Sequence, residues 1–253
     1  MKTLILTLAS AAMLMLAPAK VLARTPPPPF ADPDTRQQVA RSYEMKGDIA
    51  RARDEYASAT HWYMLALRLE PGNAGLYNKL GIAEMKVGDM ETARRQFALA
   101  VKQDPSNVDS LNNLGAVYCL ERRYRPAIRY LKQALALDET KAATHLNLAE
   151  AWMGQKQTER AMTEYARALE LDADILTSTD KEGVFAQIST PEQRAAVDFL
   201  IAKAYVKRGN VDGALDYLRQ AKELHYHDLA SVYTDPGFAP LWKDPRLSDI
   251  VQR

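Results

Sequence analysis

Few of the side chains that commonly carry out chemistry lie close together in this sequence. His225 and His227 form the one close pair among four histidines, and the other two are His61 and His145. A spacing of two residues is poor metal-ligand geometry on a helix, and no further His or Cys cluster lies nearby to complete a zinc shell. Cys119 is the only cysteine and has no neighbouring His to activate it. The sequence therefore predicts no metal site, no cofactor and no catalytic group.

The charged residues argue against a polyanion ligand. Lys and Arg number 33 against 32 Asp and Glu, which gives a formal net charge of +1. This balance disfavours a nucleic-acid partner and disfavours binding to membrane headgroups. One local basic cluster is interpreted as the solvated face of a turn, and it consists of Arg122, Arg123, Arg125 and Arg129.

The first residues have the pattern of an export signal. Lys2 supplies a positive start, residues 3–17 are almost wholly apolar, and small-residue cleavage sites follow at Ala19 and Ala23. The apolar run is shorter than the roughly 20 residues that span a bilayer, which favours a cleaved signal peptide over 1–23 rather than an uncleaved anchor. No cysteine stands at either site for lipid attachment. We therefore expect an exported periplasmic or extracellular protein that is not a lipoprotein, with a Pro-rich linker over 24–35.

A 34-residue period governs the middle of the chain. Asn78-Lys79-Leu80-Gly81 recurs as Asn112-Asn113-Leu114-Gly115 and, less closely, as Leu146-Asn147-Leu148-Ala149. In the second half of each unit, a small, a bulky and a small residue follow at spacings of four and three, which places them on one helix face. These triplets are Ala93, Phe97 and Ala100, then Ala127, Leu131 and Ala134, then Ala161, Tyr165 and Ala168.

Between the two halves of each unit the sequence predicts a turn. The turns fall at Gly88-Asp89, Arg122-Arg123, Lys156-Gln157 and Gly209-Asn210. This helix-turn-helix pattern resembles the tetratricopeptide repeat (TPR) family, with close matches over 77–105 and 111–137. The resemblance implies an all-α fold, namely a right-handed superhelical solenoid of about five TPR units with a C-terminal capping segment.

The repeat domain is expected over 36–224. Its units are placed near 36–59 (extended to 73), 74–107, 108–141, 142–175 and 191–224, with an insertion over 173–189 and a cap over 225–253. In the first unit Gly47-Asp48 is assigned to the turn, and a second small-bulky-small pattern at Ala59, Tyr63 and Ala66 predicts one long helix from about Ile49 to Glu70. In the tail, the residues expected to cover the apolar face of the last repeat are Phe238, Leu241, Trp242, Leu247 and Ile250.

In the TPR family, the first helices of successive repeats line a concave groove that holds peptides. The stripe of this sequence that corresponds to the groove mixes amide with apolar side chains, which suit an extended backbone and adaptable apolar contact. The asparagines have an alternative role in packing between repeats, and His145 is interpreted as a half-buried core residue. The groove candidates are Asn78, Ile82, Met85, Asn112, Asn113, Ala116, Cys119, Leu146, Asn147, Glu150, Met153, Phe199 and Lys203.

The sequence thus favours a non-catalytic scaffold or adaptor that binds a peptide or protein segment in its groove. The alternative is a self-associating structural scaffold of the cell envelope, with a second copy of the chain as its partner. An enzyme is the least favoured class, because no acid, base or nucleophile set converges. No stable membrane span is expected after signal cleavage, and the groove residues leave the identity of the partner open.

Overall fold

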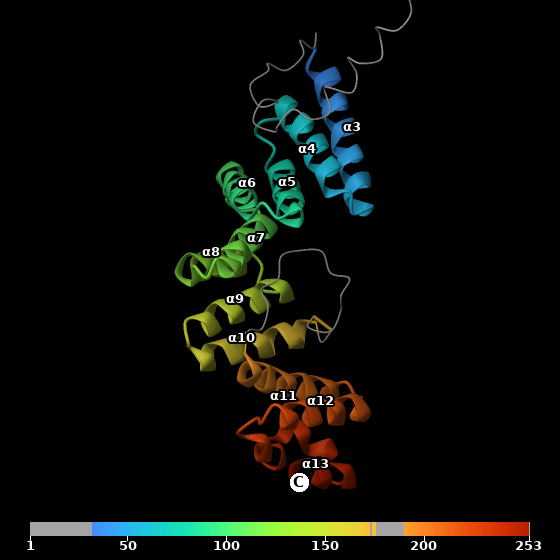
Figure 1. Ribbon diagram of the computed structural model, residues 1–253, viewed down its shortest axis with the longest axis vertical. Helices are drawn as coiled ribbons and strands as arrows, with labels where there is room; N and C mark the ends of the chain where they lie inside the picture. The colour runs from blue at the N-terminus through green and yellow to red at the C-terminus, as the bar shows by residue number, and fades with distance from the viewer. Residues whose placement is uncertain (1–31, 173, 176–189, 253) are drawn as a thin grey trace, which may run out of the picture. The chain divides into compact units, whose positions relative to one another are not determined.

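The computed structural model describes residues 32–172, 174–175 and 190–252, and this part of the chain is helical without any strand. The predicted signal peptide, residues 24–31 of the predicted linker and most of the predicted insertion lie outside the described residues. The all-α fold built from helix pairs is confirmed (Figure 1). The elements are α3 (Pro33–Ala52), α4 (Tyr56–Leu69), α5 (Ala74–Val87), α6 (Met90–Gln103), α7 (Val108–Leu120), α8 (Tyr124–Leu137), α9 (Ala142–Gly154), α10 (Thr158–Leu171), α11 (Pro191–Lys207), α12 (Val211–Glu223), the 3-10 helices η1 (Leu229–Tyr233) and η2 (Pro236–Leu241), and α13 (Pro245–Gln252).

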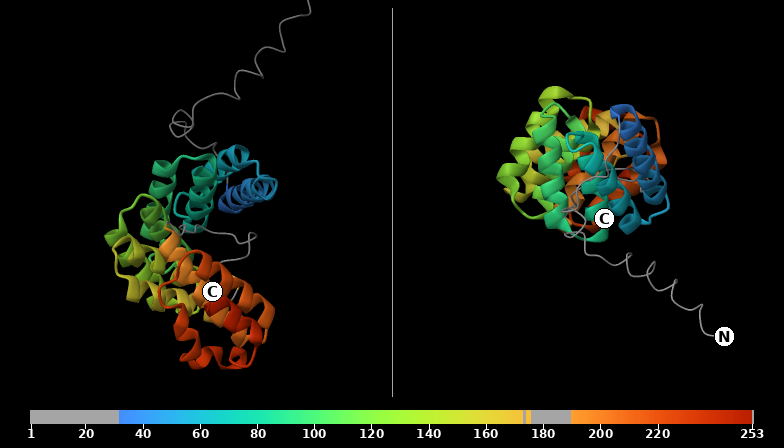
Figure 2. Two further views of the ribbon diagram at one scale, coloured as in Figure 1. Left: turned by 60° about the horizontal axis from the view of Figure 1, so that its bottom comes forward. Right: turned by 90° about the horizontal axis from the view of Figure 1, so that it is seen from above.

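The helices form two compact units, the first ending at Gln103 and the second beginning at Asp104. In the first unit α3 packs against α4, α4 against α5, and α5 against α6. In the second, the pairs are α7 with α8, α9 with α10 and α11 with α12, and α7 also contacts α9. Figure 2 shows the members of each pair side by side from two further directions.

The turns inside the helix pairs share one backbone feature. A residue with positive φ occurs at Asp54 (59°), Gly88 (98°), Arg122 (58°) and Lys156 (61°), which are 34 residues apart, and again at Gly209 (77°) in the last pair. A left-handed residue ends the first helix and lets the chain reverse into the second. Glycine adopts this conformation without a Cβ penalty, whereas the three other residue types carry it as strain.

Gly88→Ala tests this account of the turns. A Cβ added at Gly88 meets nothing within 4 Å, so the cost comes from the backbone conformation alone. We expect a loss of about 1 kcal/mol of unfolding free energy, measured by urea denaturation. The matched control is Gly72→Ala, because Gly72 is also open to solvent but has no left-handed φ. Equal effects of the two substitutions would contradict the assignment.

In the first three pairs, a glycine on the first helix receives a large side chain from the second. A Cβ on Gly81 would lie 2.6 Å from Cε1 of Phe97, and one on Gly115 would lie 2.5 Å from Cγ of Leu131. Both Phe97 and Leu131 are fully buried. The 34-residue register therefore records a close approach of two helices.

The first pair differs from the sequence prediction, and its geometry explains why. A single helix over Ile49–Glu70 is wrong, because α3 ends at Ala52 and α4 begins at Tyr56. Tyr63 of α4 packs on Gly47, where a Cβ would lie 2.5 Å from its ring. Gly47 is thus the packing glycine inside α3 and not a turn residue.

The start of α3 also extends into the predicted linker. The side chain of Asp32 caps the helix by accepting from the backbone N–H of Thr35 at 2.7 Å, and Pro33 stands in the first turn. Proline is favoured there because that position needs no N–H donor within the helix. Residues 33–35, which were predicted to lie in the linker, therefore belong to α3.

The tail packs on the last helix pair. Phe238, Leu241, Leu247 and Ile250 are buried in one cluster with side chains of α11 and α12. Trp242 differs from the expectation, because its side chain is 45% exposed while its Nε1 donates to the carbonyl of Val232 at 2.9 Å. Four of the five predicted side chains therefore contribute to this cluster, and the indole lies at its edge.

Candidate interaction surface

The structure places the thirteen predicted groove residues in two different environments. Asn78, Ile82 and Met85 lie half-buried on α5 in the first unit, and Lys203 on α11 is partly exposed. The other nine are buried on α7, α9 and α11. They are Asn112, Asn113, Ala116, Cys119, Leu146, Asn147, Glu150, Met153 and Phe199.

The buried asparagines bond to each other. Asn147 on α9 donates its side-chain amide to Oδ1 of Asn112 on α7 at 3.0 Å, and Asn112 donates to Oδ1 of Asn113 at 3.3 Å. Cys119 lies beside them, with Sγ 3.6 Å from the carbonyl of Asn147. Burial raises the pKa of the Cys119 thiol to about 12, so it stays protonated. Of the two roles considered for these asparagines, packing between helix pairs is the one the contacts support.

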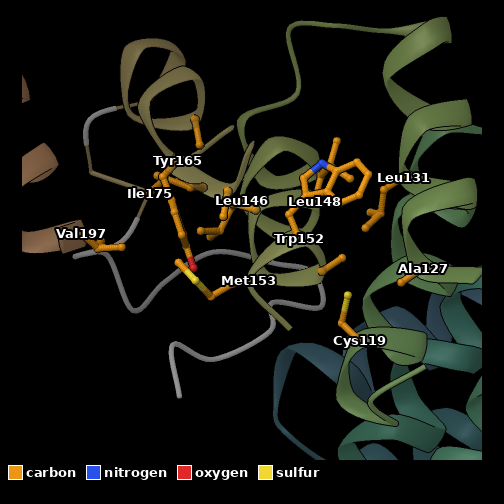
Figure 3. Packing of buried hydrophobic residues seen from close by; sticks show 14 of the residues in the cluster. Cys119, Ala127, Leu131, Leu146, Leu148, Trp152, Met153, Tyr165, Ile175 and Val197 are labelled. Carbon is orange, nitrogen blue, oxygen red and sulfur yellow. The ribbon is translucent and has the colours of Figure 1, made fainter. Parts of the chain in front are cut away.

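A residue beyond α10 contributes to the same interior. Ile175 is 7% exposed and belongs to the buried cluster that contains Leu146 and Met153 of α9 and Val197 of α11 (Figure 3). Leu146 and Met153 were predicted to offer apolar contacts to a ligand. In the structure, an apolar side chain of the chain itself, Ile175, joins them.

The C-terminal tail likewise packs against predicted groove residues of α11. The ring centroid of Phe199 lies 4.9 Å from that of Phe238 and 4.8 Å from that of Tyr226. Lys203 forms an ion pair with Asp235, with Nζ 2.7 Å from Oδ2. Both predicted groove residues of α11 thus contact the chain's own C-terminal segment.

A cleft of about 800 Å³ remains between α10, α11 and η2. Its walls include the apolar side chains of Leu169 and Leu200, with Lys207 and Arg208 among the charged residues that line it. Arg208 is held by Asp174 at 3.1 Å.

A carboxyl and a tyrosine hydroxyl recur as a pair at one repeat position. Tyr63 donates to Oδ1 of Asp48 at 2.8 Å, and Tyr165 donates to the buried carboxylate of Glu150. Burial raises the pKa of Glu150, and the bond from Tyr165 opposes that shift. The pairs are 102 residues apart, which is three repeat lengths. Glu150 is therefore a buried carboxyl with a dedicated donor.

Comparison with known families identifies the repeats. Family models described as tetratricopeptide repeats match residues 40–73, 120–176 and 196–225. The chain carries tetratricopeptide repeats. The match over 40–73 begins inside α3 and runs past the end of α4, so the first TPR unit comprises this helix pair.

Solved TPR structures share the fold. A MamA protein is 19% identical, with 79% of this chain and 96% of that chain covered at a TM-score of 0.53. A MamA fragment from Desulfovibrio magneticus RS-1 is 20% identical, with 73% and 94% covered at 0.53. YrrB, described as a TPR protein with an unusual peptide-binding site, is 18% identical, with 76% and 89% covered at 0.50. At these identities the likeness concerns the fold alone. Curated protein sequences give no significant match.

In the first compact unit, which contains α3 to α6, the stripe keeps solvent-accessible charge. Lys79 of α5 reaches α3, where its Nζ lies 2.7 Å from Glu44 and 2.8 Å from Asp48. The three side chains are 30–37% exposed. Burial disfavours the charged ammonium, but its two carboxylate partners outweigh that effect and raise the pKa of Lys79. Ile82 and Met85 follow along α5 and are half-buried.

His145, at the first helix of the fourth TPR unit, is fixed by two acceptors. Its Nδ1 lies 2.6 Å from Oε2 of Glu164 and its Nε2 lies 3.0 Å from the carbonyl of Glu139. Burial disfavours the charged ring, but these hydrogen bonds outweigh burial and the nearby Arg167, so the pKa of His145 is raised. The imidazolium, which has two donors, satisfies both partners.

This arrangement predicts a pH-dependent contribution to stability. Because the folded pKa exceeds the unfolded value, the stabilisation is complete below about pH 6.5 and is lost as pH rises through the folded pKa. The control is His145→Leu, which borrows Leu111 from the equivalent position of the preceding TPR unit. The stability advantage of the wild type over this variant should shrink by roughly 1.4 kcal/mol for each unit by which the folded pKa is raised. Urea denaturation across pH measures it, and a constant or growing difference would contradict the pairing.

Other chemistry has no assembled site in the described ranges. No group of three or more His, Cys, Asp or Glu side chains is placed there to hold a metal ion. His225 and His227 follow the end of α12, where His225 has a positive φ of 58° and the ring of Tyr226 contacts that of His227. Of the helices described, none is long and apolar enough to cross a membrane.

Proposed function

We propose that this TPR protein is a non-catalytic scaffold that binds a polypeptide segment on the stripe of its first compact unit. That surface is the α3–α5 face, defined by Glu44, Asp48, Lys79, Ile82 and Met85. The supporting observation is a contrast within one chain. The equivalent positions of α7 and α9 are buried, those of α11 contact the C-terminal tail, and those of α3 and α5 keep accessible surface.

The chemistry of the α3–α5 face fits a segment with both an apolar and a polar anchor. Met85 is unbranched and adapts to irregular apolar contacts, and Ile82 lies one turn before it. At the other end, Lys79 and the two carboxylates offer donors and acceptors of both signs within one ion-pair network. A segment with an aliphatic side chain beside a polar residue would satisfy both ends.

Site-specific photocrosslinking in the native host tests this proposal. A photoreactive residue at Met85 should give a discrete adduct, and the same residue at Ala98, exposed on α6, should not. Ile82→Glu combined with the Met85 probe should abolish the adduct while the helical content stays unchanged. Equal adducts at both positions, or an adduct insensitive to Ile82→Glu, would show that the α3–α5 face is not the binding surface. An adduct of twice the chain's mass would favour the self-associating scaffold instead.

We also propose that the protein is exported. Support comes from the Lys2 start, the apolar run over 3–17 and the small-residue sites that follow. N-terminal sequencing of the protein recovered from an envelope fraction should begin at residue 20 or 24. An intact Met1 on protein from the cytoplasmic fraction would exclude export.

A further inference from the structure

Helix α8 and the turn before it concentrate positive charge in a chain that is otherwise balanced. Residues 121–137 contain five cationic side chains and a single acid, Glu121. Arg125, Arg129 and Lys132 follow each other at spacings of four and three, which places them on one face of the helix. The turn adds Arg122 and Arg123, and all five side chains are exposed.

Two of these cations lie over a stacked pair of tyrosines. The rings of Tyr118 on α7 and Tyr130 on α8 are parallel within 3°, with centroids 5.7 Å apart. The guanidinium of Arg123 lies 4.7 Å from the Tyr118 centroid, and that of Arg129 lies 4.7 Å from the Tyr130 centroid. Stacking on a ring orients a guanidinium and leaves the N–H groups at its edge available to an anion.

The ring of Trp152 extends the same surface to α10. Trp152 on α9 is only 7% exposed, and Lys132 lies 5.4 Å from its ring centroid. Arg160, on α10, lies 4.9 Å from the same centroid. The second helices of two neighbouring TPR units, α8 and α10, thus each place a cation over one buried indole.

Acidic partners for this surface are scarce within the described chain. Arg123 pairs with Glu121 at 3.4 Å. Arg122, Arg125, Arg129, Lys132 and Arg160 form no ion pair with any carboxylate of the described residues. An ordinary solvated helix face intersperses both signs of charge, and α8 contains no acid at all.

We propose that this cationic–aromatic face, defined by Arg122, Arg125, Arg129, Lys132 and Arg160 together with the rings of Tyr130 and Trp152, docks an acidic segment of a partner polypeptide. Its length suits a short segment: a helix of α8's length spans about 20 Å, which an extended chain of roughly six residues covers. The face is bounded by Glu121 before α8 and by Asp138 and Glu139 after it, which disfavours a long polyanion such as duplex DNA. It uses the second helices of the repeats, so it shares no residue with the α3–α5 face.

Fluorescence anisotropy with the full chain and defined probes tests the proposal. The probe is a labelled octapeptide of Glu and Ala, compared with its Gln and Ala counterpart. The wild type should bind the Glu peptide more tightly, and Arg125→Glu/Arg129→Glu should weaken binding at least about tenfold at low salt. The matched control is Arg41→Glu/Lys102→Glu, at exposed positions of the first compact unit. This variant changes the net charge equally and should leave binding unchanged.

A third variant separates the aromatic contribution from net charge. Tyr130→Leu keeps every cation but removes the ring beneath Arg129, and it should weaken the Glu peptide by about threefold while the far-ultraviolet spectrum is retained. Equal loss in both charge-reversal variants, or no preference for Glu over Gln, overturns the proposal. So does binding of a single-stranded oligonucleotide of the same charge as tightly as the peptide. None of these outcomes depends on the adduct at Met85.

Discussion

Replacing Phe238 by alanine is expected to lower the free energy of unfolding by about 3–5 kcal/mol. The side chain is fully buried at the centre of the cluster that joins the tail to the last TPR unit, and it contacts the ring of Phe199. No neighbouring side chain in this packed cluster can refill a phenyl-sized space without moving backbone.

The loss should be local because repeat arrays are stabilised by contacts between neighbouring elements. Amide hydrogen exchange should accelerate in α11, α12 and α13 and stay unchanged in α3 to α6. The control is Tyr233→Ala, a large aromatic of the same tail that is 39% exposed, for which we expect a change below about 1 kcal/mol. A uniform rise in exchange along the chain, or equal effects of the two substitutions, would contradict the role of Phe238 as the central residue of this cluster.

The repeat register was readable from sequence because it records one recurring contact. A small residue on the first helix and a large one on the second must face each other in every unit, so both recur at the same interval. The helix boundaries of the first TPR unit were predicted wrongly, although this unit obeys the same rule. Gly47 stands 34 residues before Gly81, and Tyr63 stands 34 before Phe97. The competing signal was Gly47-Asp48, which looks like a turn only until its partner Tyr63 is recognised.

The sequence could not predict which stripe residues stay accessible to solvent, because their accessibility depends on segments outside the repeat. Nothing in the 34-residue pattern states that Ile175 joins the cluster of Leu146 and Met153, or that Phe238 packs on Phe199. The cationic face was missed for a related reason. The four arginines around the start of α8 were noticed as charge, but the tyrosine pair beneath Arg123 and Arg129 joins two helices and has no signature along the chain.

The paired carboxyl and tyrosine show how repeats differ while the fold is kept. Where the second helix presents Tyr165, the first presents Glu150, and Tyr63 likewise meets Asp48. In the second unit the same two positions hold Ile82 and Phe97, and in the third they hold Ala116 and Leu131. Hydroxyl and carboxyl therefore occur together or not at all, as expected when a buried polar group must find a partner.

Tyr165→Phe is accordingly expected to cost about 1–3 kcal/mol, since it removes the donor from a buried carboxylate. Glu150→Ile combined with Tyr165→Phe copies the Ile82–Phe97 pair and should recover most of that loss. Tyr63→Phe serves as the control, because Asp48 is 37% exposed and water can replace the lost hydroxyl.

The penalty of Tyr165→Phe should also shrink in acid. Burial raises the folded pKa of Glu150 above its unfolded value, so the folded state takes up the proton first and stability gains as pH falls through that window. A neutral carboxyl needs its donor less than a carboxylate does. Urea denaturation of the four proteins at neutral and at acidic pH measures both effects. If the double variant were no more stable than Tyr165→Phe, the pair would owe its recurrence to shape rather than to hydrogen bonding.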